Sequence, residues 1–137
     1  MMMMKHLMTA VAALAIGAAV AVADEGHDHA HDHPHDHGAK HDGIVAHSGH
    51  HHVELVASGN GITLYITDED GKEEDASNAK ATATVLAGGK TETVALAPAG
   101  GNGLKGSGGF TAGKGTTVVI SLTMPGHAPE QVRFKLD

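Results

Sequence analysis

From residue 50 to residue 137 the chain is a series of short stretches in which apolar and polar residues alternate, separated by Gly, Asn, Asp and Pro. Alternation with a period of two places one face of a strand in a core and the other in water. The pattern is clearest where Ile62, Leu64 and Ile66 are separated by Thr63 and Tyr65. It predicts an all-β sandwich or barrel, with strands at residues 51–57, 62–68, 80–87, 91–97, 104–110, 116–124 and 130–136.

The composition limits what such a domain can do. With 137 residues the chain has room for one domain, and with 2% aromatic residues its core must be built from Val, Leu, Ile and Ala. A net charge of −7 and the scarcity of aromatic rings argue against nucleic acid as a partner. The absence of cysteine excludes disulfides, thiolate zinc sites, iron–sulfur clusters and cysteine nucleophiles.

The N-terminus has the features of a secretory signal peptide. Lys5 precedes an apolar run over residues 7–22, and Ala21 and Ala23 stand at the positions that a signal peptidase reads. This run is shorter than the roughly 20 residues that a helix needs to span a bilayer. We therefore expect residues 1–23 to be removed, leaving no membrane span. An exported chain without cysteine suits the periplasm, although secretion from a Gram-positive cell stays open.

Residues 24–49 differ in composition from the rest of the chain. They are mainly His, Asp, Gly, Ala and Pro, and Ile44 and Val45 are their only branched apolar residues. Such a segment buries too little apolar surface to offset the entropy of ordering the chain. The sequence predicts a disordered arm over residues 24–49, followed by a folded domain over residues 50–137.

The arm contains a repeat of alternating histidines. Six of them stand at every second position with three aspartates between, and His41 with Asp42 repeats the unit; the run comprises His27, Asp28, His29, His31, Asp32, His33, His35, Asp36 and His37. Neutral imidazole binds zinc (Zn2+), Ni2+, Co2+ and Cu2+, and a neighbouring carboxylate can ligate or orient the ring. Because many ligand combinations are nearly equivalent, the repeat predicts several labile sites, suited to capture and transfer. Zinc is the first choice.

Two other interpretations of the arm stay open. A low-complexity tail can simply keep a protein soluble. The arm can also sense pH, because residues 24–52 carry one basic and six acidic side chains, hence −5, and protonation of their 11 histidines would change this to +6.

A second group of histidines, His47, His50, His51 and His52, lies where the arm meets the first expected strand. If the strand begins there, His50, His52 and Glu54 project from one face, an arrangement that can chelate a metal.

The order of the strands brings further candidates to this place. In an up-and-down arrangement, the start of the first strand shares an end of the domain with the acidic connection at residues 68–75 and with the loop at residues 125–129, which contains His127. We therefore predict a domain site made of His51 or His52, His127 and an acid from the connection. The alternative is that His127 and the acids are solvated turn residues.

Catalytic motifs are not found. Ser48 beside two histidines lacks the context of a nucleophile, the acids that begin at Asp68 do not have the spacing of a calcium-binding EF-hand, and the Gly-rich stretches lack the Gly-Lys-Ser/Thr ending of a phosphate loop. The chain is not expected to be an enzyme.

Two resemblances follow from these residues. The repeat at residues 27–42 resembles the His-rich arms of periplasmic zinc-handling proteins, including zinc importer binding proteins and zinc or nickel chaperones. The domain, through Val53-Glu-Leu-Val56 and the stretches at residues 63–71 and 84–89, resembles small periplasmic immunoglobulin-like modules of the YtkA or FixH kind, some of them associated with copper or other heavy metals. The second resemblance implies an immunoglobulin-like antiparallel β-sandwich. Copper(I) carriers usually have Met clusters, whereas Met124 is the only Met after residue 23.

These features together predict a metal buffer or chaperone that serves a periplasmic importer or efflux system. A protein of a different class, a non-catalytic envelope interaction module with an incidental His arm, is the alternative.

Overall fold

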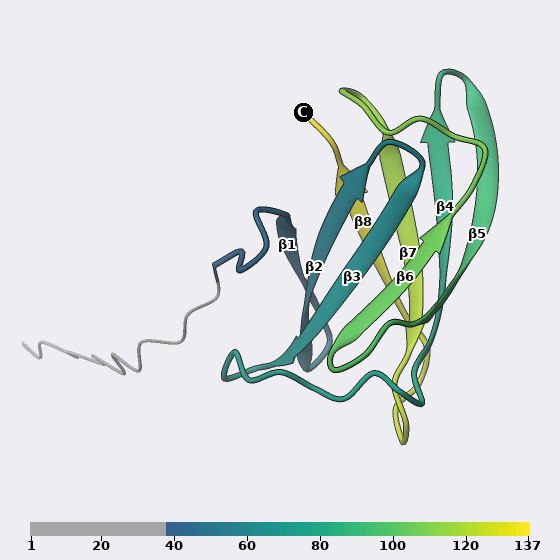
Figure 1. Cartoon of the computed structure of the whole chain (residues 1–137). Helices are drawn as coiled ribbons and strands as arrows, with labels where there is room; N and C mark the ends of the chain where they lie inside the picture. Colours follow the sequence, from purple (N-terminus) through teal and green to yellow (C-terminus); the bar gives the residue numbers. More distant parts are fainter. Residues whose placement is uncertain (1–37) are drawn as a thin grey trace, which may run out of the picture. The chain divides into compact units, whose positions relative to one another are not determined.

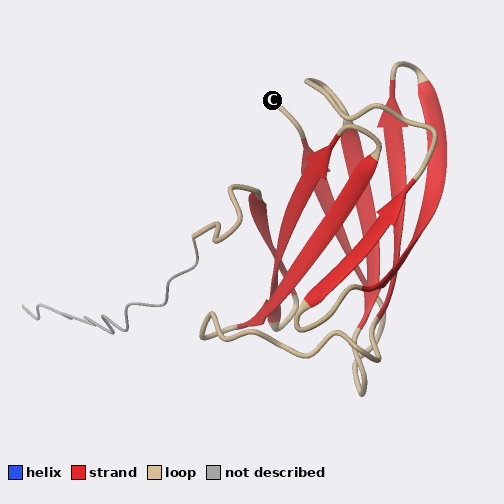
Figure 2. Cartoon of the chain, viewed as in Figure 1, coloured by secondary structure: helices blue, strands red, loops and turns tan. Residues whose placement is uncertain are grey.

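The computed structural model describes residues 38–137, which form eight strands and no helix (Figures 1 and 2). The strands are β1 (Ile44–Ser48), β2 (His51–Ser58), β3 (Gly61–Asp68), β4 (Lys80–Ala87), β5 (Lys90–Pro98), β6 (Gly103–Ser107), β7 (Thr117–Thr123) and β8 (Glu130–Lys135). The all-β prediction is confirmed, and each of the seven expected strands has a counterpart between β2 and β8. The expected signal peptide and the histidine repeat at residues 27–37 lie outside the described residues.

All eight strands belong to one antiparallel sheet in the order β1-β2-β3-β6-β5-β4-β7-β8. The sheet folds over, so that β1, β2, β3 and β6 lie in front of β4, β5, β7 and β8 in Figure 1. The two halves are joined by a short pairing of β5 with β6, in which Ala97 lies opposite Lys105 and Pro98 opposite Leu104. The outermost strands also meet, because Ser48 Oγ of β1 donates a hydrogen bond of 2.8 Å to Glu130 Oε2 of β8.

The core lies between the two halves of the sheet and follows the predicted alternation. In β3 the side chains of Ile62, Leu64 and Ile66 are buried while their neighbours are partly exposed, and Val118 and Ile120 of β7 behave in the same way. Full burial of each such side chain contributes about 1.5–3 kcal/mol relative to its exposure. Apolar alternation therefore decides which side of β3 and β7 faces the core.

The expected boundary between arm and domain is wrong. The prediction assigned residues 44–48 to the arm, but they form β1 and pair with β2 from Ile44 opposite Leu55 to Ser48 opposite His51. A tight turn containing Gly49, with a φ of +56°, joins the two strands. Pairing with β2 satisfies the backbone N–H and C=O groups of this segment, although Ile44 is exposed and Val45 and Ala46 are only partly buried.

Within residues 38–137, no helix has the length and apolar character needed to cross a bilayer.

Candidate functional site

The six histidines of residues 38–137 fall into two groups that lie in different places. We call His41, His47 and His52 the outer-face group and His50, His51 and His127 the loop-end group. The predicted ligands of the repeat lie outside the described residues; they are His27, Asp28, His29, His31, Asp32, His33, His35, Asp36 and His37. The groups separate because consecutive residues of β2 point to opposite faces.

The outer-face group is organised by the buried carboxylate of Glu54, which is 6% exposed. Its oxygens accept hydrogen bonds from the backbone N–H groups of Lys40, His41 and Gly43 at 3.1, 2.7 and 2.9 Å. The His41 ring lies 3.1 Å from the same carboxylate through Nδ1 and stacks on Tyr65, with ring centroids 3.6 Å apart. Residues 40–43 are thereby held against β2 and β3; we call them the arm root.

Local backbone geometry allows the arm root to wrap around Glu54. Asp42 has a φ of +58°, a left-handed conformation that Asp tolerates better than most residues. At Gly43 a side chain would collide with the carbonyl oxygen of Leu55. Burial acts to raise the pKa of Glu54, whereas the donors of the arm root act to lower it; the donors prevail, and the pKa lies below its ordinary value.

His52 and His47 complete this group. Nδ1 of His52 donates to the carbonyl oxygen of Asp68 at 2.9 Å. The His47 ring meets the His52 ring edge-on, with ring centroids 4.0 Å apart. A cavity of about 20 Å³ lies between His41, His52 and Glu54, enough for one water-sized occupant.

The predicted chelate of His50, His52 and Glu54 does not form. β2 begins at His51, so His50 lies in the preceding turn and its Nδ1 contacts Glu69 Oε1 at 2.6 Å. The oxygens of Glu54 are occupied by the arm root. The hydrogen bond and the negative charge of Glu69 raise the pKa of the exposed His50.

The loop-end group is built around His51, which shares the core-facing side of β2 with Val53 and Leu55 and is 2% exposed. Its Nε2 lies 3.0 Å from Glu74 Oε2, and its Nδ1 lies 3.4 Å from Glu130 Oε2. The ring of His51 thus sits between two carboxylates at the end of the core.

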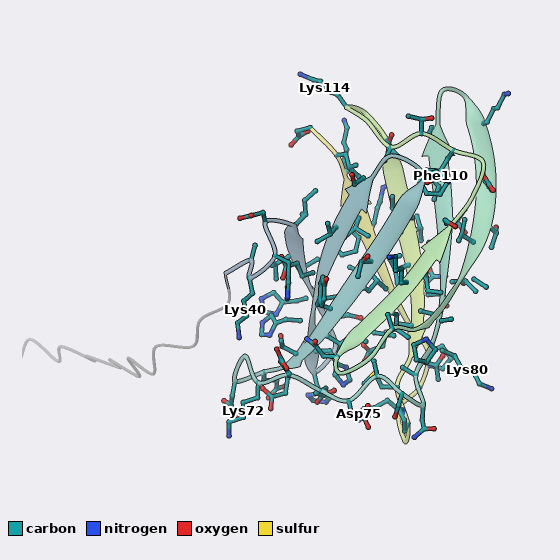
Figure 3. All side chains as sticks on the ribbon, viewed as in Figure 1. Lys40, Lys72, Asp75, Lys80, Phe110 and Lys114 are labelled. Carbon is teal, nitrogen blue, oxygen red and sulfur yellow. The ribbon has the colours of Figure 1, made fainter. Side chains whose placement is uncertain are left out.

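His127 reaches the same place from the turn between β7 and β8. Its ring meets that of His51 edge-on, with centroids 4.9 Å apart, and lies 6.4 Å from that of His50. The predicted meeting of His51, His127 and an acid from the connection is therefore present. In Figure 1 the connections β3–β4 and β7–β8 lie at one end of the domain, where Figure 3 labels Lys72 and Asp75.

The loop-end group lies in a strongly negative part of the chain. Residues 68–75 contain six acidic side chains and one basic one, Lys72, hence a charge of −5. His50, His51, His127 and Glu74 line an open hollow of about 290 Å³ together with acids of this connection. Imidazole nitrogens and carboxylate oxygens in a negative field favour the binding of a divalent cation.

Over residues 38–137, however, no three His, Asp or Glu side chains converge closely enough to form an assembled metal centre. The predicted metal role of these histidines therefore remains a prediction.

Sequence reasoning missed Glu130 and did not single out Glu74. The sequence contains a pattern that indicates Glu130. It stands two residues before Val132 in the inward-facing series of β8, just as His51 stands two residues before Val53 in that of β2. Polar residues at the ends of two core-facing series are candidates for a mutual contact.

Comparison of the chain with protein-family models, with curated proteins and with solved structures finds no match.

Proposed function

We propose that this chain is a periplasmic protein that binds divalent transition metals, zinc first, and acts as a buffer or chaperone for an importer or efflux system. The observation that carries the proposal is the alternation of His and Asp over residues 27–42. Its last histidine, His41, is bonded to the domain at Glu54. Nickel, cobalt and copper(II) are the alternatives, since imidazole and carboxylate ligands suit all of them.

The chemistry of the repeat suits a carrier. Three or four ligands can be chosen from it in many nearly equivalent ways, so bound ions exchange readily among them. Binding requires neutral imidazole, and it therefore weakens towards pH 5–6, near and below the ordinary histidine pKa. Such a segment collects metal at neutral pH and releases it to a tighter acceptor.

The arm root, which contains the last histidine of the repeat, His41, is held against the domain close to the acidic connection. Lys40 Nζ donates to the carbonyl oxygen of Gly71 at 2.9 Å, which ties the arm root to the acidic connection.

Calorimetric titration of residues 24–137 with zinc, nickel and copper(II) at pH 7.5 tests the proposal. The matched variant replaces the six alternating histidines with Gln and leaves residues 38–137 intact; it carries changes at His27, His29, His31, His33, His35 and His37. We expect several ions to bind the unsubstituted chain and most of this capacity to be lost in the variant. If no metal binds the unsubstituted chain more tightly than about 100 μM, roughly −5.5 kcal/mol, the proposal is wrong and the interaction module takes its place.

A further inference from the structure

His51 is a buried imidazole with a carboxylate at each ring nitrogen. Glu74 Oε2 lies 3.0 Å from Nε2 and Glu130 Oε2 lies 3.4 Å from Nδ1. A neutral imidazole has one N–H donor and one lone pair, and an ionised carboxylate is only an acceptor. One of the two carboxylates therefore faces a lone pair unless a second proton or a metal cation stands between them.

The surroundings of the two carboxylates assign their roles. Glu130 Oε2 also accepts a hydrogen bond from Ser48 Oγ at 2.8 Å, so Glu130 is held in place by β1. A fixed carboxylate that accepts Nδ1–H sets the tautomer and the orientation of a ring whose other nitrogen binds a metal. Nε2 of His51 then carries the lone pair and lies 3.0 Å from Glu74 Oε2, and both residues line the open hollow.

We propose that the domain holds its own divalent transition-metal site, in which His51 Nε2, Glu74 and His127 are the ligands and Glu130 is a positioning residue. The proposal deepens the proposed function and rests on it for the choice of zinc. Three protein ligands leave the fourth tetrahedral position open.

The geometry requires small movements. Ligand atoms about 2.0–2.2 Å from zinc lie roughly 3.4 Å apart at a tetrahedral angle, close to the 3.0 Å between His51 Nε2 and Glu74 Oε2. His127 is exposed in a turn and its ring lies edge-on to His51. Rotation of this side chain brings a ring nitrogen towards the gap, which completes a ligand set that is not assembled in the structure.

The negative charge around the loop-end group favours a bound dication. The connection at residues 68–75 carries −5, which attracts a divalent cation. The burial of His51 strengthens this interaction, because the effective dielectric constant near the core is low.

The test uses residues 24–137 in which the six alternating histidines of the repeat are Gln, so that the domain site is measured alone. Zinc titration at pH 7.5 is expected to show one site, weakened at least tenfold by Glu74→Gln or by His127→Ala. Glu73→Gln is the matched control. It removes the same charge from the neighbouring residue, whose carboxylate is not one of the proposed ligands. An unchanged zinc affinity in both Glu74→Gln and His127→Ala would overturn the proposal.

Nitrogen NMR of His51 tests the positioning role of Glu130. Zinc is expected to shift the Nε2 resonance while Nδ1 keeps its proton. Glu130→Gln should reduce zinc affinity about 10–100-fold, and the proton of the His51 ring should no longer be fixed on Nδ1. Ser48→Ala, which removes only the bond to Glu130, should have a smaller effect in the same direction. Thermal unfolding of each variant shows whether it is folded.

The two proposals fail in different ways. If residues 24–137 with the intact repeat bind zinc but the variant without the six histidines shows no site, the domain proposal is wrong and the proposed function stands. The His51 ring can also be found to carry protons on both nitrogens at pH 7.5 in the presence of zinc. This result overturns the domain proposal alone, because Nε2 then has no lone pair for a metal and His51 forms an ion pair with the two glutamates. If no form binds any metal, both proposals are wrong.

Discussion

His51 in β2 and Glu130 in β8 occupy inward-facing positions at the same end of the core, and Nδ1 of His51 lies 3.4 Å from Glu130 Oε2. Ser48 of β1 bonds to the same glutamate oxygen. The carboxylate of Glu130, which belongs to the edge strand β8, thus contacts both the other edge strand, β1, and the strand that carries His51, β2. The contact closes the end of the core on which the loop-end group is built.

Removing this carboxylate is expected to destabilise the fold. Glu130→Leu leaves the buried His51 ring and the Ser48 hydroxyl without their acceptor, which costs about 1–3 kcal/mol of unfolding free energy. Urea unfolding at pH 7.5 measures the difference. Gln131→Leu, at the exposed next position, should change stability by no more than about 0.5 kcal/mol, and equal losses in the two variants would contradict the assignment.

Glu54→Gln is expected to release the arm root. The amide has one acceptor oxygen where the carboxylate accepts from three backbone N–H groups. Hydrogen exchange at the amides of Lys40, His41 and Gly43 should accelerate, while the core amides of β3 and β7 keep their protection, because the opening is local. Unchanged exchange at all three amides would show that Glu54 does not hold this segment.

Acid should release the arm root in the unsubstituted chain. The pKa of Glu54 in the folded state lies below its ordinary value of 4.5. The stabilisation by its charge is therefore fully present above about pH 4.5 and is lost as the pH falls through the lowered value. Hydrogen exchange at the Gly43 amide can be measured with a chelator present, from pH 6 downwards. Protection should fall as the pH drops below about 4.5, and the difference in protection between the unsubstituted chain and Glu54→Gln should vanish there. A difference that persists to the lowest pH would contradict the assignment.

Shortening the chain should show where the folded domain begins. A chain that starts at Gly38 retains β1 and the Ser48–Glu130 bond, and we expect it to unfold at nearly the same temperature as residues 24–137. A chain that starts at His50 exposes the edge of β2 and loses that bond, so its melting temperature should fall markedly. Equal melting temperatures for both shortened chains would mean that β1 contributes nothing to stability.

Local sequence was sufficient to predict most strands. The series Ile62, Leu64 and Ile66 has a period of two, and that period depends only on the geometry of an extended backbone. The alternating direction of successive strands also predicted that His127 and the acidic connection meet the start of β2, as they do. The metal chemistry of the repeat at residues 27–42 follows from the sequence as well and remains a proposal.

Tertiary structure decided what local pattern does not encode. β1 buries little apolar surface, since Ile44 is exposed and Val45 and Ala46 are only partly buried, and it is held by pairing with β2 along its whole length. The turn at Gly49 sets the first residue of β2, which turns His51 inward and His52 outward. Glu130 lies 79 residues beyond His51, and they meet because the folded-over sheet brings β8 to that end of β2. Periodicity is a property of neighbouring residues, whereas the choice of partner depends on how the whole sheet closes.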